Sequence, residues 1–162
     1  MSRTLSVLAA LSALALTSSA LAQDYVRVEM EIDVAASAED VWGIVGGYCD
    51  IAVWFPQLDC EITSGDGEMG TVRVLLGGAI TEILVSKTDL SYAYTQPVVE
   101  GQFYDLYHGQ LEARAVTDSS SKLLYTLVYD ASNTEDIEAD MARRRGMFEG
   151  ALASMKELAE AD

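Results

Sequence analysis

Polar and apolar residues alternate along the segment that follows residue 23. Residues 25–34 read Tyr-Val-Arg-Val-Glu-Met-Glu-Ile-Asp-Val, and this period of two predicts a half-buried strand. Ser37, with Asp40 three residues later, then predicts the start of a helix that ends at Gly46. A second short helix is expected over residues 50–55. The apolar side of the first helix consists of Val41, Trp42, Ile44 and Val45.

Residues 58–130 predict strands separated by turns. Apolar stretches of strand length are bounded there by glycine, proline and other turn-forming residues. Gly77-Gly78 predicts a tight hairpin turn between two of these strands. With the first strand, the sheet is expected to have seven strands. The six that follow the helices cover residues 60–62, 72–76, 80–87, 91–95, 103–116 and 122–129.

The C-terminal segment predicts one long helix. Ser132 and Glu135 have the spacing of a capping box. Apolar residues recur at helical spacing after them, which gives the helix one apolar stripe. That stripe must lie on an apolar surface, and the concave face of an antiparallel sheet supplies one. The stripe contains Ile137, Met141, Phe148, Leu152, Met155 and Leu158 or Ala159.

Strand alternation places several of the eight tyrosines on the concave face of the sheet. Tyr107, Tyr125 and Tyr129 share their faces with small or aliphatic residues, and Tyr92 and Tyr94 form a similar pair. A buried phenol needs a hydrogen-bond partner, so tyrosines around one cavity suit a ligand with an apolar body and polar groups. The alternative is that these are ordinary sheet tyrosines with hydrated hydroxyls.

Two side chains are candidates for acid–base chemistry. His108 is the only histidine and has an unperturbed pKa near neutrality, but alternation places it opposite Tyr107 and therefore outside the cavity. Glu82 is interpreted as a surface carboxylate. We therefore expect no catalytic residue, no cofactor and no metal site.

Residues 1–22 have the composition of an export signal. Arg3 supplies the positive start, residues 5–16 are uncharged and mostly apolar, and Ala20-Leu21-Ala22 is a typical cleavage site. The apolar run is too short to span the ~30 Å of a bilayer, which argues against an uncleaved anchor. We expect cleavage near Ala22, a periplasmic or secreted protein, and one domain over residues 23–162.

The charge balance excludes some partners. The full chain has a formal net charge of −16. Loss of residues 1–22 removes one basic residue and no acidic one. Such an acidic surface repels nucleic acid and anionic membranes, so we expect neither a nucleic-acid partner nor stable membrane insertion. We expect a monomer.

The two cysteines, Cys49 and Cys60, are eleven residues apart. In an oxidising compartment this spacing favours a disulfide across a short helix, and two separate buried thiols are the alternative. A metal site is not expected, because His108 lies far from both in the sequence.

Four short segments resemble the START-like or Bet v 1-like (SRPBCC) superfamily, in its bacterial polyketide cyclase/dehydrase and lipid-transport branch. Residues 35–42 resemble its Pro-Ala-x-x-Val-Trp helix start, and residues 53–56 its Trp-His-Pro segment with Phe55 in place of histidine. Residues 67–73 resemble its Gly-x-Gly-x-x-Arg lead into a strand, and residues 89–92 its Leu-x-Tyr strand start.

The resemblance covers residues 25–160 and implies an α+β helix-grip fold. In that fold a curved seven-stranded antiparallel sheet surrounds a long C-terminal helix, in the order strand, helix, helix, six strands, helix, and a cavity lies between them. A fold of this kind predicts a pocket but neither its ligand nor its chemistry. The cavity candidates are Trp54, Phe55, Tyr92, Tyr94, Tyr107, Tyr125, Tyr129, Met141, Arg144 and Phe148.

The function expected from these features is an exported binding or carrier protein. Its ligand would be a small hydrophobic or amphipathic molecule such as a lipid, an aromatic compound or a polyketide. Arg144 lies on the apolar stripe and would reach a carboxylate or phosphate at the cavity mouth, or else pair with a local acid such as Asp140 or Glu149. Two alternatives stay open: a cyclase or dehydratase acting on a polyketide-like substrate, and a protein-interaction module without a ligand.

Overall fold

The computed structural model describes residues 24–98 and 106–161, and its elements follow the predicted order. The expected export signal and the start of the expected strand at Phe103 lie outside these residues. In chain order the elements are β1 (Tyr25–Val34), α1 (Ala38–Val45), α2 (Ile51–Trp54), β2 (Cys60–Ser64), β3 (Val72–Leu75), the 3-10 turn η1 (Leu76–Gly78), β4 (Ile80–Thr88), β5 (Ser91–Thr95), β6 (Tyr107–Thr117), β7 (Ser120–Asp130) and α3 (Ile137–Ala159).

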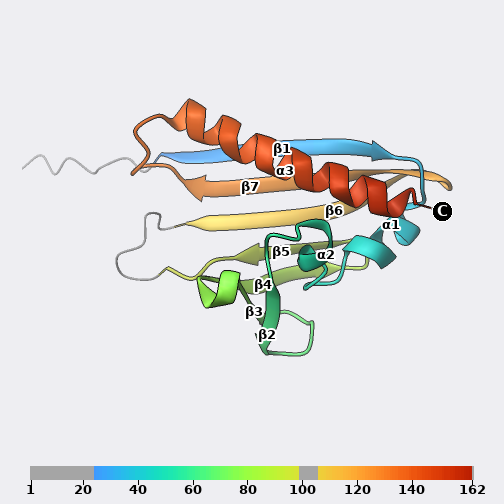
Figure 1. Ribbon diagram of the computed structural model, residues 1–162, viewed down its shortest axis with the longest axis horizontal. Coiled ribbons are helices and arrows are strands. Elements are labelled where there is room, and N and C mark those ends of the chain that lie inside the picture. The colour runs from blue at the N-terminus through green and yellow to red at the C-terminus, as the bar shows by residue number, and fades with distance from the viewer. Residues whose placement is uncertain (1–23, 99–105, 162) are drawn as a thin grey trace, which may run out of the picture.

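The strands form one seven-stranded antiparallel sheet in the order β1-β7-β6-β5-β4-β3-β2. The first and last strands of the chain are therefore neighbours, and β2 to β7 follow one another as hairpins (Figure 1). This arrangement with a C-terminal helix is the helix-grip fold, so the predicted fold class is confirmed.

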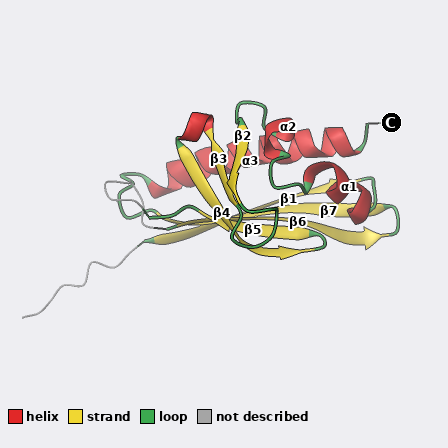
Figure 2. Cartoon of the chain, turned by 90° about the horizontal axis from the view of Figure 1, so that it is seen from below, coloured by secondary structure: helices red, strands yellow, loops and turns green. Residues whose placement is uncertain are grey.

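Strict alternation places the core on one face of the sheet. In β1 the residues Val28, Met30 and Val34 are buried, whereas the charged residues between them are exposed. The same rule buries Tyr125 and Tyr129 of β7. Figure 2 shows all three helices on one side of the sheet, with β2 and β3 rising toward them. The helices and the inward side chains together enclose the core.

Helix α3 lies along β1 and β7 and is fastened to β1 by its basic side chains (Figure 1). Lys156 Nζ donates to the Asp33 carbonyl over 2.8 Å, and Arg145 Nη1 donates to the Glu29 carbonyl over 2.7 Å. The backbone N–H of Ala35 donates to Glu160 Oε1 over 2.7 Å. Within the two described ranges, no helix has the length and apolar character that a membrane span requires.

Three local predictions are wrong. Helix α3 is capped by Asp136, whose side chain accepts from the backbone N–H of Ala139. The predicted cap, Ser132, instead contacts Asp24 and Asp130. Ile44 of α1 is 41% exposed, because α1 buries the side that carries Ala38, Val41 and Val45.

The third error concerns the β3–β4 hairpin. Its connection is longer than the predicted two-residue turn, because Leu76 is no longer paired with β4. Leu76 has a positive φ of 52°, and Gly77 and Gly78 also have positive φ values. Leu76 is the one non-glycine residue with a positive φ in the described part of the chain. Residues other than glycine are strained in this backbone conformation.

The predicted disulfide between Cys49 and Cys60 is present. It joins Cys49, two residues before α2, to the first residue of β2, so the enclosed loop contains the whole of α2. Ser37 caps α1 as predicted, with its Oγ accepting from the backbone N–H of Asp40 over 3.1 Å. The covalent bond ties the segment that carries α2 to β2, and the cap closes the first turn of α1.

Removal of the disulfide by the double substitution Cys49→Ser/Cys60→Ser is expected to lower the free energy of unfolding by about 3 kcal/mol. The bond closes a loop of roughly a dozen residues, which restricts the unfolded chain by about that amount. Urea denaturation of the oxidised wild type and of the variant measures the difference. A reduced wild-type sample is the control, and equal midpoints for all three samples would contradict the prediction.

Candidate functional site

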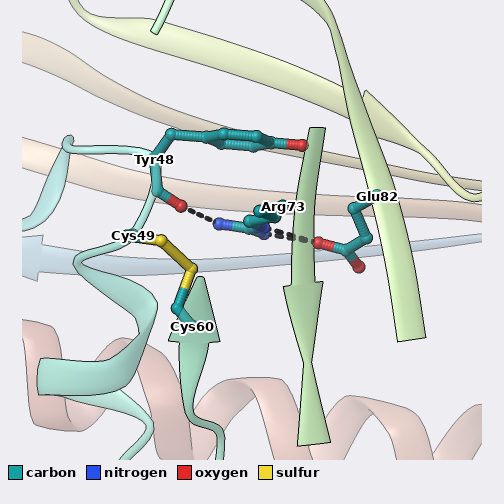
Figure 3. The surroundings of a disulfide bond; sticks show 5 residues. All are labelled: Tyr48, Cys49, Cys60, Arg73 and Glu82. Atoms are coloured by element: carbon teal, nitrogen blue, oxygen red, sulfur yellow. Dashed lines mark hydrogen bonds and ion pairs between the residues drawn. A yellow bond between two sulfur atoms is a disulfide. The ribbon is translucent and has the colours of Figure 1, made fainter. Parts of the chain in front are cut away.

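A completely buried arginine, Arg73, lies on the concave face near the β2 edge of the sheet. Arg73 of β3 points inward and pairs across the hairpin with Glu82 of β4, as Figure 3 shows. Its Nε and Nη2 donate to Glu82 Oε2 over 2.8 and 2.6 Å. Its Nη1 donates to the backbone carbonyl of Tyr48. All three nitrogens of the guanidinium are thus hydrogen-bonded within the core.

Tyrosine rings surround this guanidinium. Its central carbon lies 4.2 Å from the ring centroid of Tyr48, 5.1 Å from that of Tyr94 and 5.8 Å from that of Tyr92. Aromatic faces attract cations, most strongly where water is absent. Burial raises the pKa of each of these tyrosines, that of Tyr94 well above its ordinary value, so the phenols stay protonated beside the cation.

Glu82 connects this cluster to an apolar cavity of about 190 Å³. Glu82 Oε1 accepts from Gln96 Nε2 over 3.2 Å, and both side chains are part of the cavity wall. The rest of the wall is almost wholly apolar. It consists of Ile51, Trp54, Phe55, Leu58, Leu75, Leu76, Ile80, Tyr94, Tyr107, Met147 and Phe148. Leu76 and Met147 are 48% and 38% exposed and stand at its rim.

The disulfide loop supplies one side of this cavity. Its four lining residues, Ile51, Trp54, Phe55 and Leu58, all lie between Cys49 and Cys60. Trp54 is buried and donates from its indole nitrogen to the Val45 carbonyl over 3.3 Å. The sulfur bridge and this hydrogen bond therefore hold the wall in place.

The opposite side of the cavity depends on a glycine. Tyr94 of β5 faces Gly109 of β6, and a Cβ built on Gly109 would lie 2.2 Å from the Tyr94 ring. No side chain fits there while the ring keeps its position. The Tyr94 hydroxyl is hydrogen-bonded to the Tyr125 hydroxyl over 2.8 Å, and the Tyr125 ring lies against Phe148 of α3 at 4.5 Å between centroids.

A second cavity of about 230 Å³ lies next to the other side of the arginine cluster. Tyr48 and Tyr92, whose rings flank Arg73, are part of its wall, together with Trp42 of α1. Lys87 also lines it and donates to Glu68 Oε1 over 2.8 Å. The two cavities share no lining residue. The Arg73 guanidinium contacts the walls of both, through Tyr48 and Tyr92 on one side and Glu82 and Tyr94 on the other, and so lies between them.

A second polar cluster joins α3 to β7. Asp140 accepts from Arg144 Nε over 2.7 Å and from the Tyr129 hydroxyl over 2.7 Å, and Arg143 also donates to it. The Arg144 guanidinium lies 4.1 Å from the Tyr129 ring centroid. Burial disfavours the Asp140 anion, but these hydrogen bonds outweigh it and lower the pKa of Asp140 to about 2.

Comparison with models of protein families shows which family this chain belongs to. The family model for polyketide cyclase/dehydrase and lipid transport matches residues 25–160. The chain belongs to this family. Its fold is one that binds hydrophobic ligands. A search of curated proteins finds no match for this family member.

Solved structures with the same fold include enzymes. The protein XoxI from Bacillus cereus is 19% identical, with a TM-score of 0.69 and coverage of 81% of this chain and 93% of the other. The Zhui aromatase/cyclase from a Streptomyces species is 18% identical, with a TM-score of 0.66 and coverage of 85% and 94%. A truncated norcoclaurine synthase from Thalictrum flavum is 15% identical, with a TM-score of 0.63 and coverage of 88% and 98%. At these identities the likeness establishes the fold alone.

The structure brings half of the predicted cavity residues together in this family member. Five of them line the 190 Å³ cavity: Trp54, Phe55, Tyr94, Tyr107 and Phe148. Their contact with a ligand stays a prediction.

The other five predicted residues lie elsewhere. Tyr125 is fully buried behind Tyr94, and Tyr92 lines the second cavity. Tyr129 and Arg144 belong to the Asp140 cluster, where Arg144 pairs with a local acid. Met141 is partly buried against the core. His108 alternates with the buried Tyr107 and Gly109 in β6 and so faces away from the cavity, as predicted.

The interpretation of Glu82 as a surface carboxylate is wrong. It is 3% exposed, because its cross-strand partner Arg73 is buried with it. Sequence reasoning named Arg73 only as part of a motif and missed its role. The signal was present: Arg73 and Glu82 are equally distant from the centre of the Gly77-Gly78 turn, so a symmetrical hairpin places them opposite each other.

Substitution of Arg73 by methionine is expected to lower the free energy of unfolding by about 3–5 kcal/mol, because it leaves Glu82 buried without its cation. The double variant Arg73→Met/Glu82→Leu removes both charges and is expected to regain most of this loss. Urea denaturation compares wild type, single variant and double variant. A double variant as unstable as the single one would show that burial of an unpaired charge is not the cause.

The Asp140 cluster predicts a pH dependence. The pKa of the Asp140 carboxyl falls on folding from 3.8 to about 2. The ionised carboxylate therefore stabilises the fold above about pH 4, and this contribution is lost as the pH falls toward 2. The stability difference between wild type and Asp140→Asn should therefore be largest above pH 4 and shrink below it. Urea denaturation of both proteins from pH 2 to 6 measures the difference, and Glu157→Gln, a surface change on the same helix, is the control. A difference that stays constant over this range would contradict the assignment.

Proposed function

We propose that this family member is an exported binding protein that holds one small hydrophobic molecule in the 190 Å³ cavity. The observation that carries the proposal is the composition of the wall. Two polar side chains, Glu82 and Gln96, stand beside a set of aliphatic and aromatic residues from α2, α3 and the sheet. A concave apolar site with a few convergent polar groups is the usual form of a small-molecule site.

The size of the cavity limits the ligand. Pockets for drug-sized molecules have volumes of about 300–1,000 Å³. At about 190 Å³ the cavity accepts only a small molecule, or the end of a longer one that leaves past Leu76 and Met147. Of the three ligand classes expected from the sequence, a small aromatic compound fits this volume best.

A binding role is favoured over catalysis by the state of Glu82. A general acid or base must exchange a proton with its substrate. Glu82 is instead held in place by three hydrogen bonds from Arg73 and Gln96, and its Oε2 already accepts two of them. His108 stands on the other face of the sheet.

Export is supported by two features. Residues 1–22 have the charge, length and cleavage motif of a signal peptide. The disulfide that holds the cavity wall is a bond that persists in oxidising compartments and is rare in the cytosol. We therefore propose that the working protein acts in the periplasm or outside the cell, after cleavage near Ala22.

Native mass spectrometry of the protein recovered from its own host tests both parts of the proposal. We expect a chain that begins at Gln23 and a reproducible extra mass that organic solvent releases. The spectrum also reports the oligomeric state, which we expect to be a monomer. A chain that retains residues 1–22 would contradict export. An unliganded spectrum, unchanged after incubation with a library of small aromatic compounds and lipids, would contradict binding.

A matched pair of variants locates the ligand. Leu58→Trp places a large side chain in the cavity wall, so the extra mass is expected to disappear. Val53→Trp makes a similar change on the exposed side of α2, where Val53 is 58% exposed, and should leave the adduct intact. Loss of the adduct in both variants, or in neither, would place the ligand elsewhere.

A further inference from the structure

We propose that the cavity selects a neutral one-ring molecule that carries a hydroxyl group, and that this hydroxyl donates its hydrogen bond to Glu82. The inference rests on the proposed function, because it names the chemistry of the ligand in the same cavity. Three observations carry it: an incompletely used carboxylate in the wall, the balance of buried charge, and the volume.

Glu82 has room for one more donor. A carboxylate offers about four lone-pair sites. Two N–H groups of Arg73 occupy Oε2, and the amide of Gln96 donates to Oε1, so one site on Oε1 is left. Figure 3 shows this second oxygen turned away from Arg73. An ionised carboxylate only accepts hydrogen bonds, so the matching ligand group is a donor.

The charges exclude an ionic ligand. Arg73 and Glu82 compensate each other, so a cation in the cavity would gain little attraction and would lose its hydration against an apolar wall. An anion would meet the carboxylate oxygen at close range. Among the described residues, no cationic side chain lines the cavity, since Arg73 lies behind Glu82. A neutral hydroxyl meets the remaining acceptor without either cost.

The volume sets the size of the apolar part. An apolar cavity of about 150 Å³ is known to hold benzene. A cavity of about 190 Å³ is therefore large enough for one ring with one small substituent. The ring would lie among Leu58, Leu75 and Phe148, with its hydroxyl toward Glu82. A phenol or a small cyclic alcohol has this form.

Phenol and toluene test the inference because they have the same shape and differ only in the hydroxyl. Titrations of the disulfide-bonded wild type, followed by ¹H–¹⁵N NMR, give both affinities and show which residues respond. Toluene is the more hydrophobic of the two and binds more tightly to a purely apolar cavity. Relative to a purely apolar cavity, we expect the wild type to shift the preference toward phenol by at least about tenfold, because a hydrogen bond to a charged group contributes that much. This shift reverses the order, so that phenol binds more tightly than toluene. Benzoate should not bind.

The variant Arg73→Met/Glu82→Leu supplies the matched apolar cavity. There the order should return to toluene before phenol. The Gln96 side-chain amide, which is bonded to Glu82, should shift on addition of phenol to the wild type and less on addition of toluene. If the double variant does not fold, the order of the three probes on the wild type still decides.

The outcomes separate the two proposals. Toluene bound more tightly than phenol by the wild type would overturn the hydroxyl inference and leave the binding function standing. Benzoate bound as tightly as phenol would overturn the requirement for a neutral ligand. No response to phenol or toluene would contradict the proposed function itself, since the cavity would then not accept a one-ring molecule.

Discussion

An arginine that is withdrawn from water must recover its lost hydration from the protein around it. Arg73 is completely buried, and this requirement constrains much of the concave face. Its charge fixes Glu82 on the next strand, its third nitrogen needs the Tyr48 carbonyl, and three tyrosine rings lie within about 6 Å of its central carbon. Glu82 in turn holds Gln96 at the end of β5. The polar part of the cavity wall is thus a consequence of one buried charge.

The covalent and the ionic constraints act on neighbouring residues. Tyr48 accepts from Arg73, and the next residue, Cys49, forms the disulfide to β2. The segment that follows carries α2 and four of the cavity residues. One end of this wall is therefore held by a hydrogen bond to the core and by a sulfur bridge, and the other end by the sulfur bridge and by the pairing of Cys60 with Leu75 of β3. A short helix of four residues is not stable by itself, so its position depends on these attachments.

The sequence predicted the fold well because its signals are local and regular. Alternation along β1 and β7 gave both the strands and the inward side of Tyr125 and Tyr129. The cap of α3 was misplaced because Ser132 and Asp136 both satisfy the local rule, and the choice between them depends on contacts with Asp24 and Asp130, which are distant from one another in sequence.

The candidate site was only partly predictable for a related reason. Alternation along a strand shows which side chains point inward, but it does not show how far each one lies from a cavity. Tyr92 and Tyr94 share a face of β5, yet they line different cavities, because the side chain of Arg73 from another strand stands between them. The volume of each cavity depends on such packing and has no signature along the chain. Glu82 was wrongly interpreted as a surface residue because a glutamate is usually exposed, and here its ion pair with Arg73 causes its burial.

The position of Arg73 between the two cavities also limits the length of a ligand. A helix grip with an open interior would offer one long tunnel to a flexible chain. Here the described residues line two short chambers, and a ligand that extended from one into the other would have to displace a guanidinium with three hydrogen-bonding nitrogens. That displacement would leave buried charges without partners, at a cost of several kcal/mol. For the proposed binding function, the ion pair would therefore limit the length of the ligand and favour compact molecules over extended acyl chains.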